Sequence, residues 1–303
     1  MPDPARRDRG LLLLLTPLIW GLTFPAGKRA LEELSVPSFT AWSRLLGLLT
    51  LLVTLPLLGR RRLRLPLRRW LLLGSVLGGL MFAAFVLQTA GLARTTATNA
   101  GFVTGLYVVF TPLLGLVLFR RGVGPRAWTA VALSIVGLGL LSVPGLDDLR
   151  PRTGDLLVLA SAGLWAAHVV AVGYFAERHP PLPIALAQLL GASILHLAAT
   201  VGEGLDLRGA AEVWPLLVVT GCLGSGVAFT IQVVAQGSIS ATRAAVILAG
   251  ESVVAALTAA LWLGDRLEPH RWAGAALAVA AMVLSEVGAR RRPATRIDPA
   301  TAV

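Results

Sequence analysis

The sequence predicts an all-α membrane protein of ten transmembrane helices, built as two inverted repeats of five helices each. Three observations lead to this fold class. The 303-residue chain is 55% hydrophobic and only 14% charged, with a mean hydropathy of +0.75. Ten apolar segments follow one another along it, and its two halves match at a spacing of 144 residues.

The composition excludes several other classes of protein. A soluble domain carries about 25% charged residues, and disordered chains are poor in apolar ones. The single cysteine, Cys222, excludes an intramolecular disulfide and a cysteine-rich metal site. The only lysine, Lys28, is followed by Arg29 rather than Ser or Thr, so a phosphate-binding P-loop is absent. The zinc motif H-E-x-x-H is absent too. We therefore expect no metal and no cofactor.

Each apolar segment is about 20 residues long, enough for a helix to cross ~30 Å of hydrocarbon. The first lacks a small-residue cleavage site, so we interpret it as a retained helix rather than a signal peptide. The breaks between segments are short and carry Gly, Pro or charge. The expected helices comprise residues 11–31, 37–59, 70–93, 96–119, 126–145, 154–176, 182–201, 213–236, 241–263 and 270–288.

The net charge of +11 comes from arginines that flank the apolar segments, as in Arg6–Arg9, Arg60–Arg62 and Arg290–Arg292. Basic residues in these positions anchor helices to anionic lipid and set their orientation, so we expect no nucleic-acid partner. With the N-terminus in the cytoplasm, 18 of the 27 basic residues lie on the cytoplasmic side and eight lie outside. This bias predicts both termini in the cytoplasm.

The two halves repeat at several matched positions. These include Phe85 with Phe229, Gln88 with Gln232, Pro125 with Pro269 and Trp128 with Trp272. Because five helices are an odd number, the second copy must enter the membrane from the opposite side. The expected repeats are residues 1–145 and 153–288, with 289–303 as a cytoplasmic tail. Inverted repeats are typical of secondary transporters, which bind substrate near the midplane. A duplicated bundle without transport is the alternative.

Three stretches resemble the EamA-like branch of the drug/metabolite transporter superfamily. They are W-G-L-T-F-P-A-G-K at 20–28, T-T-A-T-N-A-G-F at 95–102 with T-P-L-L at 111–114, and G-E-S-V-V-A-A-L at 250–257 with L-G-D-R-L at 263–267. The resemblance covers residues 10–288. It implies export of small metabolites, often amino acids, or of drugs across the bacterial inner membrane. It also implies a cavity lined by the first, third, fourth, sixth, eighth and ninth helices. Ser252 stands where a proline is common, which predicts a less kinked ninth helix.

Glu251 lies in the middle of the ninth segment. A carboxyl group there usually faces the bundle interior, where it could bind a substrate amine or carry a coupled proton. A hydrogen-bonded structural role is the alternative. Its repeat mate is the neutral Tyr107, so a symmetric scaffold could bind an asymmetric substrate. Arg44 could bind a substrate carboxylate, although we expect its side chain to extend to the membrane surface.

The other candidate residues form faces at helical spacing. Met81, Phe85 and Gln88 share one face, and Ser225, Phe229 and Gln232 share its repeat mate. Each glutamine either binds substrate or joins two helices. Aromatic pairs on the first and sixth helices either line a cavity or pack the core. The expected substrate-binding residues are Trp20, Phe24, Phe85, Gln88, Tyr107, Trp165, His168, Phe229, Gln232 and Glu251, with Glu251 as the proton-coupling candidate.

The sequence therefore predicts a secondary transporter that exports small metabolites such as amino acids or amines by alternating access. A multidrug exporter on the same fold is the first alternative. An intramembrane enzyme or assembly factor is the second, with Ser225 beside His168 or His196 as its only candidate nucleophile, and no hydrolase motif surrounds this serine. We expect no enzymatic activity. The expected partners are a small-molecule substrate and the lipid bilayer, and the expected state is a monomer or weak homo-oligomer.

Overall fold

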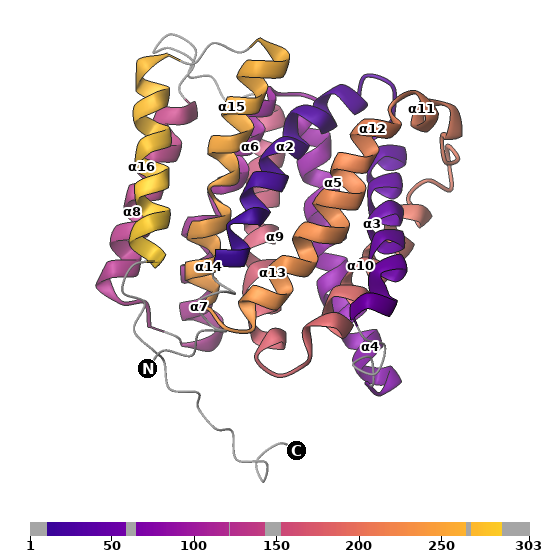
Figure 1. Cartoon of the computed structure of the whole chain (residues 1–303), viewed down its shortest axis with the longest axis horizontal. Helices are drawn as coiled ribbons and strands as arrows, with labels where there is room; N and C mark the ends of the chain where they lie inside the picture. Colours follow the sequence, from indigo (N-terminus) through magenta and orange to yellow (C-terminus); the bar gives the residue numbers. More distant parts are fainter. Residues whose placement is uncertain (1–10, 59–64, 121, 143–152, 265–267, 287–303) are drawn as a thin grey trace.

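The computed structural model describes residues 11–58, 65–120, 122–142, 153–264 and 268–286, and its elements in these ranges are all helical (Figure 1). The predicted all-α class is confirmed. The first half contains α2 (Leu15–Ala30), α3 (Val36–Leu58), α4 (Leu67–Leu73), η2 (Gly74–Gly78), α5 (Gly79–Leu92), α6 (Ala97–Gly105), α7 (Tyr107–Phe119) and α8 (Pro125–Ser142). The second contains α9 (Thr153–Ala176), α10 (Pro181–Ala198), α11 (Leu207–Glu212), α12 (Trp214–Leu217), η3 (Val218–Ala228), α13 (Phe229–Gln236), α14 (Ala241–Leu248), α15 (Glu251–Leu263) and α16 (Pro269–Glu286).

Eight helical spans in the described ranges are long and apolar enough to cross a membrane. They are Leu11–Ala30, Val36–Leu57, Leu67–Leu92, Ala97–Phe119, Thr153–Ala176, Pro181–Ala198, Trp214–Gln236 and Ala241–Trp262. The fifth and tenth predicted segments form α8 and α16, which pack side by side (Figure 1). The apolar part of α8 is shorter, and α16 carries Arg271 and Glu286 near its ends. Ten crossings therefore remain a prediction.

The outer surface of the bundle is apolar. Leu57, Val201 and Leu261 are each at least 80% exposed, and many other leucines and valines are exposed with them. Soluble monomers rarely leave apolar patches of this kind uncovered, whereas lipid covers them without cost. The structure is therefore that of a multi-pass membrane protein. The arginines 6–9, 60–62 and 290–292 and the predicted tail 289–303 lie outside the described residues, so the orientation stays a prediction.

Two irregularities interrupt the helices, and both recur 144 residues later. The π-helical η2 occupies Gly74–Gly78, and its repeat mate is the first part of η3. The fourth predicted helix is broken between α6 and α7, and the ninth between α14 and α15. At these breaks the amide of Val109 donates to the carbonyl of Leu106 over 3.0 Å, and that of Val253 to Gly250 over 3.1 Å. The repeat thus extends to backbone hydrogen bonds. The break before Ser252 is present without a proline.

The halves are joined by close backbone contacts at another repeat-related pair, Gly47 and Gly191. The helix α3 packs on η3, and α10 packs on η2. A Cβ atom on Gly47 would lie 2.5 Å from the Cβ of Ser225, and one on Gly191 would lie 2.3 Å from the carbonyl oxygen of Gly74. Only glycine allows the backbones to approach this closely.

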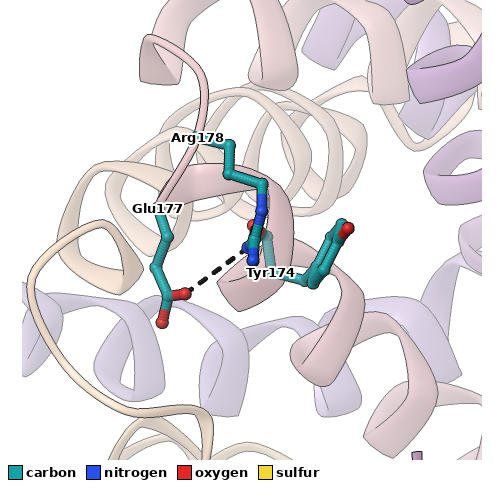
Figure 2. A network of polar contacts seen from close by, with 3 residues as sticks. All are labelled: Tyr174, Glu177 and Arg178. Atoms are coloured by element: carbon teal, nitrogen blue, oxygen red, sulfur yellow. Dashed lines mark hydrogen bonds and ion pairs between the residues drawn. The ribbon is translucent and has the colours of Figure 1, made fainter. Parts of the chain in front are cut away.

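The C-terminal end of α9 carries a separate polar cluster (Figure 2). Arg178 folds back so that its guanidinium lies 3.8 Å from the ring centre of Tyr174, donates to the Tyr174 carbonyl over 2.6 Å, and lies 3.5 Å from the carboxylate of Glu177. Partial burial, with the positive charges of Arg69 and Arg178, lowers the pKa of His179. A neutral ring fits its 3.4 Å contact with Arg69. By donating to the Tyr174 carbonyl, Arg178 caps the C-terminal end of α9.

Candidate functional site

A central cavity of about 70 Å³ lies between helices of both halves, with room for several water molecules. Its lining comes from α2, α3, α5, α6 and α7 in the first half and from α9, η3, α13 and α15 in the second. The lining residues are Trp20, Thr23, Phe24, Phe39, Arg44, Phe85, Gln88, Thr89, Leu92, Thr104, Tyr107, Trp165, Val169, Thr220, Gly224, Phe229, Gln232 and Glu251.

Nine of the ten residues expected to bind substrate lie around this cavity, and His168 does not. The His168 ring is fully buried, and its Nε2 atom lies 3.0 Å from Oε1 of Gln188 on α10. It therefore lies outside the cavity lining, with its ring centre 5.6 Å from that of Trp165. Substrate binding by the other nine stays a prediction. Sequence reasoning missed Thr104, although its spacing of three from Tyr107 places both on one face.

One wall of the cavity is aromatic and comes from both halves. It is formed by Trp20, Phe85, Trp165 and Phe229. The ring centres of Trp20 and Phe229 lie 4.7 Å apart, as do those of Phe85 and Trp165. Each indole is fixed by its N–H group, because Trp20 donates to the carbonyl of Gly224 over 2.9 Å and Trp165 donates to Oε1 of Gln88 over 3.2 Å. These four rings therefore form an aromatic wall held in place by hydrogen bonds, while Thr, Gln, Arg, Tyr and Glu side chains supply the polar part of the lining.

The two repeat-related glutamines differ in their hydrogen bonding. Gln88 accepts from Trp165 and donates to the hydroxyl of Thr104 over 3.0 Å, so its amide is engaged on both sides. Gln232 is fully buried, and neither amide atom has a hydrogen-bond partner in the part of the chain that the structure describes. An unpaired buried amide costs free energy, so Gln232 is the stronger candidate for a group that a ligand satisfies.

Glu251 and Tyr107 each stand at the first position of a helix that begins at a break, α15 and α7. Glu251 is 3% exposed, and its Oε1 atom has no hydrogen-bond partner of standard geometry among the described residues. The Tyr107 hydroxyl and the Glu251 carboxyl group nevertheless interact with each other, so the two repeat mates face one another in the cavity. The two mates therefore give the cavity one acidic and one neutral polar group.

Arg44 does not extend to the membrane surface, so the expectation from its position was wrong. Its side chain is 3% exposed and lines the cavity. The guanidinium carbon lies 3.5 Å from the ring centre of Phe85, a cation–π contact. Its Nε and Nη1 atoms have no hydrogen-bond acceptor within the described ranges. The second helix therefore contributes to the cavity through Arg44 and Phe39, beyond the six helices that the family resemblance implied.

The serine considered as a nucleophile is engaged elsewhere. The hydroxyl of Ser225 donates to the carbonyl of Thr220 over 2.9 Å, a contact within η3. In the described part of the chain it forms no hydrogen bond with His168 or His196. The arrangement offers binding groups around a cavity rather than a nucleophile beside a base.

Comparison with known proteins gives a consistent class. The model of the EamA-like transporter family matches residues 9–143 and 152–286. An uncharacterized transporter of Archaeoglobus fulgidus is 30% identical over 278 residues, covering 91% of this chain and 84% of that protein. The threonine/homoserine exporter RhtA of Salmonella typhimurium is 25% identical, with 97% of each chain covered. A probable amino-acid metabolite efflux pump of Escherichia coli is 27% identical, covering 97% and 99%. One crystal structure shares the fold, with a TM-score of 0.72 at 18% identity over 93% of this chain and 96% of that one.

Proposed function

The chain belongs to the EamA-like transporter family, and on that premise we propose that it exports a small polar metabolite, such as an amino acid or an amine, across the inner membrane. The observation that carries the proposal is the cavity lined by both halves. It combines rigid aromatic walls with the unpartnered groups of Glu251 and Gln232. Ligand sites of this composition take small organic molecules with a polar end.

Alternating access between two inverted repeats moves the substrate in this proposal. The irregularities of η2 and η3, and the paired helix breaks, support it, because equivalent discontinuous helices in two halves are a feature of secondary transporters. Ten crossings with both termini in the cytoplasm complete the proposed topology. The cavity is lined within one chain, so a monomer or weak homo-oligomer suffices for transport.

Glu251 has two compatible roles here. Its carboxylate binds the ammonium group of the substrate, and its protonation couples transport to a proton gradient. The support is its burial in the cavity lining, without an ion-pair partner among the described residues and with only the neutral Tyr107 interacting with its carboxyl group.

Multidrug export is the second candidate function, and the wall formed by Trp20, Phe85, Trp165 and Phe229 favours it. Aromatic faces attract organic cations. The positive charge of Arg44 in the same cavity disfavours a substrate that is only a cation, which makes export of an amino acid the better-supported proposal.

A flux screen in proteoliposomes tests the function directly. The full chain is reconstituted and loaded in turn with amino acids, amines and aromatic organic cations, with and without a pH gradient. We expect saturable release of at least one amino acid or amine, at a rate above that from loaded liposomes without protein. Release of organic cations alone would favour the multidrug alternative, and no release of any compound would contradict transport.

The glutamine pair allows a matched test of binding against packing. Gln88→Leu leaves the indole N–H of Trp165 and the hydroxyl of Thr104 without this partner, so we expect a loss of about 1–3 kcal/mol in stability. Gln232→Leu breaks no hydrogen bond within the described residues and removes an unpaired buried amide, so we expect equal or higher stability and a weaker apparent affinity. Unfolding in detergent and flux kinetics measure both. Unchanged flux kinetics in Gln232→Leu would mean that Gln232 only packs the core. Unchanged flux kinetics in Gln88→Leu would mean the same for Gln88.

A further inference from the structure

Arg44 places a second charge in the cavity, opposite in sign to Glu251. Among the residues that line the cavity, these two are the charged ones. Each side chain is 3% exposed, and no ion pair joins them to each other or to another group within the described residues. The cavity thus holds a buried cation and a buried acid that no ion pair neutralises within the described residues, and the neutral Tyr107 is the neighbour with which Glu251 interacts.

An unpaired buried charge is costly, and in a membrane helix it faces a wet cavity or a partner. The contact between Arg44 and Phe85 uses the flat face of the guanidinium. The N–H donors point outward from its edge, and those of Nε and Nη1 lack acceptors. A planar guanidinium with free edge donors matches the geometry of a carboxylate.

The guanidinium group of Arg44 has no equivalent in the second half. The mate of Arg44 is Gln188 on α10, which contacts His168 and does not line the cavity. The mate of Glu251 is the neutral Tyr107. Each half therefore supplies one charged group, the first a cation and the second an acid.

We propose that Arg44 binds the carboxylate of the substrate while Glu251 binds its ammonium group, so that the protein selects zwitterions over amines and organic cations. This proposal rests on the proposed export function and narrows its substrate class. The aromatic wall contacts the apolar part of the substrate between the two charged ends.

Matched pairs of compounds with and without a carboxylate test the selection. The pairs are alanine with ethylamine, leucine with isopentylamine, and phenylalanine with phenethylamine. Flux of each is measured in proteoliposomes for the wild type, Arg44→Gln and Arg44→Lys. Arg208→Gln is the control, because Arg208 is 92% exposed and pairs only with Glu212 among the described residues. Thermal unfolding in detergent is recorded for every variant.

We expect the wild type to have at least a tenfold lower KM for a zwitterion than for its amine. In Arg44→Gln the zwitterion should lose roughly 10- to 100-fold in kcat/KM, and the amine much less. Arg44→Lys should recover part of the loss. The unfolding temperature of Arg44→Gln should equal or exceed that of the wild type, because an unpaired buried charge is removed.

Four results would overturn the proposal. Equal losses for zwitterion and amine, with a lower unfolding temperature, would make Arg44 structural. Full zwitterion transport by Arg44→Gln would remove it from binding. Wild-type flux of amines without zwitterions would leave export standing and reject the zwitterion site. Absence of any flux would reject the proposed function, and this inference with it. If Arg44→Gln does not fold, the wild-type preference and Arg44→Lys decide.

Discussion

Glu251→Gln is expected to reduce transport on the order of 100-fold while leaving the protein folded. The substitution keeps the size of the side chain and removes its charge and its proton. A hydrogen bond to a charged group contributes about 1.5–3 kcal/mol, and 2.7 kcal/mol corresponds to roughly 100-fold in affinity. Because Oε1 of Glu251 has no protein partner, the fold loses no contact at that atom. Flux in proteoliposomes and thermal unfolding in detergent measure the two effects.

The control is Glu33→Gln, a change of the same chemistry at an exposed residue beyond the end of α2. It should transport like the wild type. A pH series separates the two roles of Glu251, because a bound ammonium and a carried proton both need the carboxyl group but only the second makes flux depend on a pH gradient. Equal transport by Glu251→Gln and wild type across that series would remove the residue from the mechanism.

Gly191→Ala is expected to destabilise the fold by about 1–3 kcal/mol, and Gly47→Ala should have a similar effect. The added methyl group on Gly191 would meet backbone atoms of η2, and that on Gly47 would meet η3. Backbone cannot rotate away as a long side chain can, so the helices must separate. Loss of stability is measured by thermal or denaturant unfolding in detergent, and loss of folded yield should accompany it.

The matched control is Gly163→Ala in the interior of α9, where an added methyl group meets nothing within 4 Å. Alanine is the better helix former, so this variant should be unchanged or slightly more stable. Wild-type stability in Gly191→Ala and Gly47→Ala together would contradict the close packing of α3 on η3 and of α10 on η2.

The sequence predicted the helices well because their length and apolar character are set by the hydrocarbon thickness. All ten predicted segments are helical in the described ranges, with ends that differ by a few residues. It did not predict the π-helical segments or the breaks at Leu106 and Gly250. Apolar residues occupy every face of these helices, so no periodic pattern marks a change of helical repeat.

The same limit affected the candidate site. The assumed α-helical spacing placed Ser225 on one face with Phe229 and Gln232, but Ser225 lies in η3 and does not line the cavity. Arg44 was assigned to the membrane surface because a long side chain in lipid extends to water. That rule applies to a lipid-facing helix surface, and which face of α3 meets other helices depends on packing that the sequence does not display.

The packing of α3 on η3 and of α10 on η2 has a consequence for how the protein moves. The helix α3 of the first copy packs closely on η3 of the second, and α10 of the second copy packs closely on η2 of the first. Any motion that keeps these glycine contacts intact must therefore move α3 together with η3 and α10 together with η2. Because both copies lie in one polypeptide, α3 is always made together with η3, and α10 together with η2.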